Sequence, residues 1–204
     1  MSLRSERMSE YFQNDQILVE KAQKGDQNAL NELIRKYQDR TYIYAFRLTR
    51  NQDDACDVVA DAFLRVNNAI KNFKGNSAFS TWLYRIVTNC YLDRRKRDRS
   101  KSTVSLDNTV QHDQEEITRE IEDPGDTPDE SAERNQREVM LQRALNKLPE
   151  FQKAMIIMFH AEQQTYEEIA EALDLPLGTV KSRLNRARIS LRELLVENEE
   201  LFTV

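Results

Sequence analysis

Polar side chains that could contact DNA are spaced along one predicted helix near the C-terminal end of the sequence. Apolar residues recur there at three- and four-residue steps from Val180 to Leu191, so one face of this helix is predicted to be buried. The opposite face presents hydrogen-bond donors: Lys181, Ser182, Asn185 and Arg186. In the major groove, Arg and Lys pair with guanine and Asn with adenine, and each bidentate pair contributes about 1–3 kcal/mol of discrimination. The spacing therefore favours a helix that reads duplex DNA.

The elements that must position this helix form a helix-turn-helix pattern. A preceding amphipathic helix begins near Tyr166 and has Ile169 on its apolar face. Pro176 cannot continue that helix, and Gly178 tolerates the backbone of a turn. Thr179 is predicted as the N-cap of the second helix. The alternative is an ordinary helical hairpin with a solvated basic face, which would show the same pattern.

A second group of residues combines aromatic rings with polar and cationic side chains, as binding of single-stranded DNA requires. It lies in the loop 72–80 and in the helix predicted from Thr81 onward: Phe73, Lys74, Ser77, Trp82, Arg85 and Asn89. Stacking on an aromatic ring contributes about 1–3 kcal/mol per base, and a base taken out of the duplex also needs a pocket with polar groups. The alternative is that Trp82 and Phe79 only pack in the core, as a lone Trp at helical spacing usually does.

Hydrophobic periodicity in the rest of the chain predicts helices and almost no strand. The chain has 204 residues with only 4 Gly and 4 Pro, which suits an all-α fold of two small helical domains. We predict an N-terminal helical bundle at 15–101 and a helix-turn-helix domain at 134–196, with tails at 1–14 and 197–204. Within the bundle, the residues Asn51 to Asp54 are predicted to cap a helix that runs to Ile70.

The segment between the two predicted domains, residues 102–133, is acidic. The net charge of the chain is −5, yet basic runs at 94–101 and 181–192 flank this segment. Turn residues and a low apolar content predict a flexible linker, which spans about 30 Å on average as a coil. A tether this loose cannot set the distance between two DNA sites, so a larger rigid partner must do so. The acidic charge fits a basic nucleic-acid channel on that partner, or only a solvated tether.

Other features of the sequence exclude several classes of protein. No run is apolar and long enough to span a bilayer, and the N-terminus lacks the apolar core of a signal peptide, so we predict a cytoplasmic protein without direct membrane insertion. Cys56 and Cys90 have no Cys or His neighbours at ligand spacing and are predicted as buried, reduced thiols. Because no catalytic, metal or cofactor motif is found, an enzyme is not expected.

Five motifs occur in an order that resembles one known family. The N-terminal half contains LVEKAQKGDQNAL, DACDVVADAFLRV and FKGNSAFSTWLYRIVTN, and the C-terminal half contains LNKLPEFQKAMIIMF and TYEEIAEALDLPLGTVKSRLNRAR. Together they resemble the extracytoplasmic-function (ECF) sigma factors of the sigma-70 family, similar to the RpoE type. The resemblance covers nearly everything outside the linker and the tails. It implies a non-enzymatic subunit of RNA polymerase that directs promoter-specific transcription initiation, with domains like sigma regions 2 and 4.

The resemblance also implies roles for individual residues. The loop and the Trp-containing helix would open and recognise the minus-ten element through Phe73, Lys74, Thr81, Trp82, Arg85 and Asn89. The basic run would hold duplex phosphates through Arg94, Arg95, Lys96 and Arg97. The second helix of the C-terminal unit would recognise the minus-thirty-five element through Thr179, Lys181, Ser182, Arg183, Asn185 and Arg186. The helix DACDVVADAFLRV would dock on the clamp coiled coil of the polymerase β′ subunit through Asp54, Asp57, Val58, Asp61, Ala62 and Arg65. Ala60-Asp61 departs there from a more usual Gln-Glu pair.

The partners implied by the resemblance are core RNA polymerase, through its β′ clamp coiled coil and its β subunit, promoter DNA in double- and single-stranded form, and an anti-sigma factor. Such an inhibitor would hold the protein at the membrane, whereas the active protein would be nucleoid-associated. Two other classes of function fit parts of the sequence. A stand-alone helix-turn-helix transcription regulator would not need the aromatic site, and an interaction adaptor would not need base-reading donors.

Overall fold

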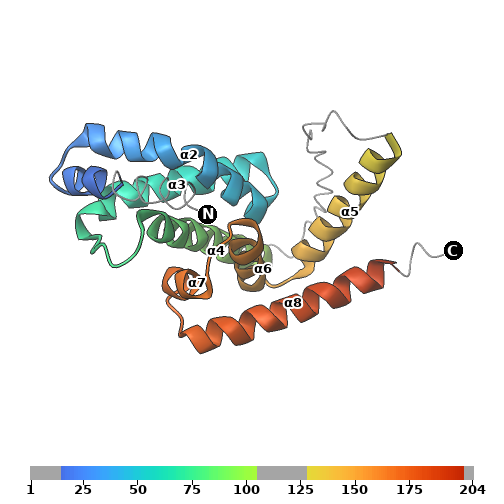
Figure 1. Cartoon of the computed structure of the whole chain (residues 1–204). Coiled ribbons are helices and arrows are strands. Elements are labelled where there is room, and N and C mark those ends of the chain that lie inside the picture. Colours follow the sequence, from blue (N-terminus) through green and yellow to red (C-terminus); the bar gives the residue numbers. More distant parts are fainter. Residues whose placement is uncertain (1–14, 105–127, 200–204) are drawn as a thin grey trace, which may run out of the picture.

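The computed structural model describes residues 15–104 and 128–199, which form helices joined by short connections (Figure 1). No strand occurs within these two ranges, so the predicted all-α fold is confirmed. The predicted N-terminal tail, 1–14, lies outside the described residues, as do 105–127 of the predicted linker and 200–204 of the predicted C-terminal tail. Within the described ranges, no helix is both long and apolar enough to cross a membrane.

The N-terminal domain is a bundle in which α2, α3 and α4 pack on one another. After a first helix at residues 15–23, α2 spans Gln27–Thr49, α3 spans Gln52–Ala69 and α4 spans Phe79–Val104, with a 3-10 turn, η1, at Ile70–Asn72. The apolar stripes of these helices meet in a core whose fully buried side chains include Leu33, Tyr44, Leu48, Val58, Val66 and Val87. This bundle forms the platform for the loop 73–78, which connects η1 to α4.

Side-chain caps fix where the helices of this bundle begin. Asp26 Oδ1 accepts hydrogen bonds from the backbone N–H groups of Asn28 at 2.9 Å and Ala29 at 3.2 Å, which starts α2. Asn51 Oδ1 accepts from the N–H of Asp54 at 2.9 Å, so the predicted cap of α3 is confirmed. Arg50, at φ 55°, takes the left-handed conformation that ends α2 and lets the chain turn into α3.

The C-terminal domain contains four α-helices and one π-helical turn within the described ranges. They are α5 (Pro128–Lys147), α6 (Glu150–Ile156), the π-helical turn η2 (Ile157–Ala161), α7 (Tyr166–Leu173) and α8 (Leu177–Glu199). Met155, Met158, Ile169 and Leu184 are fully buried between them. A capping box starts α7, because Thr165 Oγ1 accepts from the Glu168 N–H at 3.1 Å while the Thr165 N–H donates to Glu168 Oε2 at 2.8 Å.

The turn between α7 and α8 differs from the prediction in its details. Asp174, at φ 54°, is the left-handed cap that ends α7. Helix α8 then begins at Leu177, three residues before the start at Val180 that an N-cap at Thr179 implies, and Gly178 lies inside it. Thr179 is therefore not an N-cap, since its own N–H already donates to the carbonyl of Pro176 at 2.8 Å. A proline immediately before a helix is compatible with this start, because its fixed φ suits the first turn.

Two helices extend into the predicted linker, one from each end. Helix α4 continues to Val104, and α5 already begins at Pro128, so both helices enter the range 102–133 that was expected to be irregular. Pro at the first position of α5 is favourable because its missing N–H would have no intrahelical partner there. The domain boundaries at 101 and 134 remain predictions.

The two domains pack against each other along one side of α4. Helix α4 contacts both α6 and α7, and α2 contacts η2, so the C-terminal domain lies across the N-terminal bundle (Figure 1). Helix α8 reaches away from this contact, along the far side of the C-terminal domain (Figure 1). The sequence did not predict this contact, because a flexible linker alone implies no fixed arrangement of the two domains.

Candidate nucleic-acid interface

A pocket of about 380 Å³ lies beside the loop that follows η1. Its walls come from the first helix, the loop and the start of α4, and are formed by Asp15, Gln16, Val19, Glu20, Gln23, Phe73, Lys74, Gly75, Ser77, Ala78 and Phe79. Gln23 Nε2 donates to the carbonyl oxygens of Ile70 at 3.2 Å and Phe73 at 2.6 Å, which ties the loop to the first helix. Gly75 has φ 69°, a conformation in which a side chain would be strained.

Three aromatic rings meet at the loop and the first turn of α4. The ring centroids of Phe73 and Trp82 lie 4.8 Å apart, and both rings approach Phe79, at 6.3 and 5.8 Å. Phe79 is buried and also contacts Tyr37, whereas Phe73 and Trp82 are half-buried. Phe79 therefore packs in the core, as the alternative prediction for Trp82 and Phe79 stated. Trp82 packs on the core with part of its side chain and leaves part at the surface.

The first helix forms a wall of this pocket that the sequence did not predict. Asp15 is only 5% exposed and accepts hydrogen bonds from the Tyr37 hydroxyl and from Lys36 Nζ, the latter at 2.6 Å. Burial, together with the hydrogen bond to Asp15, raises the pKa of Tyr37. These bonds anchor the first helix on α2. No sequence signal separates Asp15 from the acidic residues that commonly begin a helix.

The other predicted residues of α4 are divided between surface and interior. Asn89 is exposed, and Arg85 is half-buried with its guanidinium 3.6 Å from the carboxylate of Asp174 in the C-terminal domain. Lys74, in the loop, is exposed. Thr81 is 3% exposed, so its side chain packs within the bundle and its predicted contact with DNA is not available in this structure.

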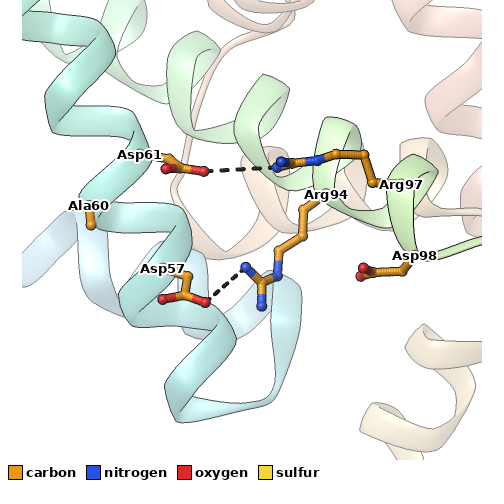
Figure 2. A pocket seen from close by; sticks show the side chains of 6 residues that line it. All are labelled: Asp57, Ala60, Asp61, Arg94, Arg97 and Asp98. Atoms are coloured by element: carbon orange, nitrogen blue, oxygen red, sulfur yellow. Dashed lines mark hydrogen bonds and ion pairs between the residues drawn. The ribbon is translucent and has the colours of Figure 1, made fainter. Parts of the chain in front are cut away.

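The predicted phosphate contacts of the basic run are partly occupied by carboxylates. Arg94 donates to Asp57 at 2.9 Å (Figure 2) and to Asp54 at 2.6 Å, which joins α4 to α3. Arg97 lies 3.9 Å from Asp61 on the same side (Figure 2). Burial lowers the pKa of Arg94, but the two carboxylates outweigh it and hold this pKa above its usual range. Arg94 therefore acts as a link between helices in this structure, which differs from its predicted role on DNA.

The remaining two residues of that run differ from Arg94. Lys96 is exposed, as a phosphate contact requires. Arg95 points to the other side of α4, where its Nε donates to Glu150 of the C-terminal domain at 2.9 Å.

The predicted polymerase-binding residues of α3 also lie on two faces. Asp57 and Arg65 are exposed, and Asp54 and Asp61 are half-buried. Val58 and Ala62 are 1% and 0% exposed, because their four-residue spacing places them on the stripe that faces the core, so their side chains are not at the surface in this structure.

Two apolar residues of the same helix are also at the surface. Leu64 is 63% exposed, and Ala60 is exposed beside Asp61. A single exposed leucine is common on protein surfaces and does not by itself identify a contact site.

Helix α8 has the donor face that the sequence predicted. Val180, Leu184 and Ala187 are 0% exposed, so the opposite side of the helix is turned to solvent. The exposed donors are Lys181, Ser182, Arg183, Asn185 and Arg186, while Thr179 is half-buried. The guanidinium of Arg183 also lies 5.2 Å from the ring centroid of Phe151.

Comparison with known proteins gives the family of this chain. The model of sigma-70 region 2 matches residues 33–101, and the model of sigma-70 region 4 matches residues 138–191. The chain is 36% identical over 179 residues to the ECF RNA polymerase sigma-E factor of Haemophilus influenzae, a match that covers 85% of this chain and 91% of that protein. This chain belongs to the ECF sigma factors. It is also 33% identical to the ECF RNA polymerase sigma factor SigW of Bacillus subtilis, over 87% and 94% of the two chains.

Two solved structures share the fold of this sigma factor. The sigma factor RpoE of Bartonella quintana, in complex with the anti-sigma factor NepR, aligns with a TM-score of 0.62 and 24% identity over 81% of this chain and 95% of that one. CnrH, in complex with the cytosolic domain of CnrY, aligns with a TM-score of 0.61 and 23% identity over 90% and 98%. Family membership places the chain among transcription initiation factors.

The cysteines of this sigma factor differ from each other. Cys90 is buried as predicted, and burial raises the pKa of its thiol to about 11. Cys56 was also predicted to be buried, but it is exposed because it lies on the solvent side of α3, one residue after the core position Ala55.

Proposed function

We propose that this sigma factor binds core RNA polymerase and directs it to promoters by using its two domains on two forms of DNA. The N-terminal domain captures an unpaired base of the minus-ten element in the pocket beside the loop 73–78. The C-terminal domain inserts α8 into the major groove of the minus-thirty-five element. The observation that supports this best is the pocket of about 380 Å³, whose wall includes Phe73 and a loop fixed by Gln23. Trp82 packs on Phe73 beside this pocket.

The pocket has the properties that an unpaired base requires. Part of the Phe73 surface in its wall remains accessible for stacking, which contributes about 1–3 kcal/mol per base, and the neighbouring Trp82 is half-buried as well. Gln16, Glu20 and Ser77 bring polar groups to the walls, which can pair with the edge of the base. Capture of a base that opens transiently needs no nucleotide hydrolysis, because the energy comes from stacking and from binding of the surrounding duplex.

Contacts with protein partners use other faces of the molecule. The exposed face of α3, with Asp57, Ala60 and Leu64, is suited to the β′ clamp coiled coil, and the C-terminal domain to the β subunit. The polymerase then sets the distance between the two DNA sites, which the linker cannot do. Control by an anti-sigma factor, which would hold the protein at the membrane, is supported by the likeness to RpoE bound to NepR.

Transcription with reconstituted holoenzyme tests this function. Core RNA polymerase with and without the purified chain is given a library of promoter fragments, and the transcripts are sequenced. We expect start sites that occur only with the chain and that share two sequence elements. If instead the chain alone shifts duplex DNA with the same specificity and no new starts appear with polymerase, the protein is a stand-alone regulator.

A single substitution tests the pocket side of the proposal. Asn89→Ala is expected to weaken discrimination at the minus-ten element while binding of core polymerase stays unchanged, because Asn89 is exposed on the helix that follows the pocket. The measurement is transcription from promoters with each base at the captured position, beside a pull-down of core enzyme. Equal losses in both assays would show that Asn89 is structural.

A further inference from the structure

Two carboxylates of the C-terminal domain are buried against the N-terminal domain. The side chain of Glu162, just after η2, is only 10% exposed. Its Oε1 accepts from Arg47 at 2.5 Å, and its Oε2 accepts from the Tyr84 hydroxyl at 2.7 Å. Arg47 belongs to α2 and Tyr84 to α4, so Glu162 joins the C-terminal domain to two helices of the other domain.

Glu150, at the start of α6, makes a second contact of this kind. Its side chain is 14% exposed and accepts from the Tyr91 hydroxyl and from Arg95 Nε, the latter at 2.9 Å. Arg99 lies 3.5 Å from the same carboxylate. Burial alone would raise the pKa of Glu150, but the hydrogen bonds from Tyr91 and Arg95 hold this pKa below its usual range. The Glu150 carboxylate therefore stays ionised in the contact.

The backbone that presents Glu162 has an uncommon conformation. The preceding turn η2 is π-helical, and π-helical turns are rare and occur frequently at functional sites. The N–H of Glu162 donates to the carbonyl of Ile157 at 3.0 Å, which closes this turn. Gln163 follows with φ 56°, which few non-glycine residues adopt, and its Nε2 donates to the carbonyl of His160 at 2.6 Å. The backbone therefore fixes Glu162 at the point where the C-terminal domain meets α2 and α4.

The group that Glu162 meets is also held in place, by contacts within the N-terminal domain. The ring of Tyr84 lies edge-on to that of Tyr44, with centroids 4.8 Å apart. Thr88 Oγ1 is 2.7 Å from the Tyr44 hydroxyl and donates to the carbonyl of Tyr84 at 2.8 Å. Tyr44 and Thr88 are both 0% exposed. The Tyr84 hydroxyl is therefore positioned before the C-terminal domain is added.

The ion pairs between the two domains share one polarity. Glu150 and Glu162 are anions of the C-terminal domain that pair with cations of the N-terminal domain, and Asp174 lies 3.6 Å from Arg85 in the same sense. Opposite charges therefore attract the two domains to each other across one face of α4. Arg85 and Arg95, which the sequence predicted as DNA contacts, are both paired in this way. Polar contacts between domains of one chain usually allow the domains to separate.

This closed form keeps the two proposed DNA-reading sites near each other. On α4, Arg85 follows Trp82 by three residues, or about 5 Å. The pairing of Arg85 with Asp174 keeps their Cα atoms within about 15 Å. Lys181 follows Asp174 by seven residues, the last four of them in α8, which adds at most about 16 Å. Trp82 and Lys181 are therefore less than about 40 Å apart.

A promoter requires a much larger separation. Elements at minus ten and minus thirty-five lie about 25 base pairs apart, which is about 85 Å along the duplex. This length is far below the persistence length of DNA, about 150 base pairs, so bending the duplex until its ends are about 40 Å apart is costly. The closed form can therefore not bind both elements of one promoter.

We propose that the closed form is a resting state of this sigma factor, in which Glu150 and Glu162 hold the two domains together, and that binding of core RNA polymerase separates them. The inference rests on the proposed function and deepens it, because it adds an opening step before promoter recognition. Since polymerase binds the open form, the apparent affinity of the chain for polymerase is reduced by the fraction of molecules that are open.

Energy transfer between two dyes on single molecules of the full chain tests the resting state. The dyes are attached to cysteines introduced by Glu32→Cys on α2 and Glu193→Cys on α8, two exposed positions, with Cys56→Ser to remove the exposed natural thiol. We expect one dominant population with high transfer in the free chain. Addition of core RNA polymerase should convert it to a population with low transfer, because the domains move apart.

Neutral substitutions on either side of the contact test what holds the closed form. E150Q/E162Q should shift most free molecules to low transfer without polymerase. The control E167Q/E171Q removes the same charge from two exposed glutamates of α7 and should leave high transfer dominant. R47Q/R95Q should open the chain as E150Q/E162Q does, and the two variants combined should open it no further, because both remove the same contacts. Circular dichroism should show unchanged helix content in all of them.

The open fraction of the free wild-type chain predicts a second measurement. Opening the chain with E150Q/E162Q should raise its apparent affinity for core polymerase by the inverse of that fraction, about tenfold when about one molecule in ten is open. E167Q/E171Q should change this affinity little.

Three results overturn the inference. The first is a free wild-type chain that is mostly in the low-transfer population. The second is E150Q/E162Q and R47Q/R95Q chains that open no more than E167Q/E171Q. The third is high transfer that persists when core polymerase is bound. These results are distinct from a failure of the proposed function, because promoter-specific transcription by the wild-type chain with core polymerase is measured separately.

Discussion

The base pocket and the donor face of α8 present polar groups to DNA in different ways. The pocket is assembled from the first helix, the loop 73–78 and the start of α4, and Gln23 holds the loop in place. The donor face belongs to one helix, whose opposite side is buried through Val180 and Leu184. A site built from three segments depends on tertiary contacts, whereas a site on one helix depends mainly on the periodicity of that helix. Substitutions should therefore act cooperatively in the pocket and independently on α8.

The largest effect is expected at Trp82, which packs on Phe73 beside the pocket. Trp82→Ala should slow promoter opening about 10- to 100-fold, because a stacking surface worth about 1–3 kcal/mol per base is removed. The rate of open-complex formation measures this, with Trp82→Phe as the control that keeps a ring. Gln23→Ala should act in the same direction because it frees the loop. In a double-mutant cycle the two costs should not add, and additive costs would contradict a composite pocket.

Each substitution on α8 should instead weaken recognition of a single base pair. Asn185→Ala and Arg186→Ala are each expected to cost about 1–3 kcal/mol at one position of the minus-thirty-five element and to add in the double variant. Transcription from promoters with single base changes would show this. A strongly non-additive result would mean that α8 also depends on tertiary support, and the contrast between the two sites would be lost.

The neighbouring residues Arg94 and Arg95 allow a contact within one domain to be compared with a contact between domains on the same helix. Arg94→Met should destabilise the N-terminal domain by about 1–2 kcal/mol, since the partly exposed carboxylates Asp54 and Asp57 both lose their partner. Arg95→Met should change that stability by less than about 0.5 kcal/mol, because its partner Glu150 lies in the other domain. Urea unfolding followed by the fluorescence of Trp82, the single Trp of the chain, reports on this domain. Equal effects would contradict the separate roles of the two arginines.

The smallest effect concerns pH and a buried lysine of the C-terminal domain. Lys153 is 4% exposed, and burial lowers its pKa to about 8 from an ordinary value of 10.5. Between these values the unfolded chain binds more protons than the folded one, so stability should rise as the pH increases from about 8 toward 10. Thermal unfolding across this window should show the rise in the wild type. It should be absent in Lys153→Met, and a rise of the same size in that variant would exclude Lys153 as the cause.

The features that could be predicted from the sequence are those set by local rules. The periodicity of α8 placed Lys181, Asn185 and Arg186 at the surface, and Asn51 was identified as part of a cap from its position before an apolar stripe. The role of Asp15 could not be predicted, because its partners Lys36 and Tyr37 lie more than twenty residues away. The burial of Thr81 could not be predicted, because polar side chains also occupy buried positions inside helical bundles.

The contact between the domains could not be predicted from the sequence for a similar reason. Glu150 and Glu162 look like ordinary charged residues at helix ends, and their partners belong to the other domain. A periodic pattern shows which face of a helix is buried within its own domain. It does not show which ionised side chains a second domain will cover, because that depends on complementary charges that are distant in the chain.

The contrast between Cys56 and Cys90 gives the protein a built-in attachment point for probes. A maleimide dye reacts with thiolate, so it should modify the exposed Cys56 and leave Cys90 intact, whose pKa of about 11 keeps it protonated at neutral pH. The reporter would then sit on the outer side of α3 without any engineered cysteine. Its anisotropy would follow the tumbling of the N-terminal domain alone when the domains part.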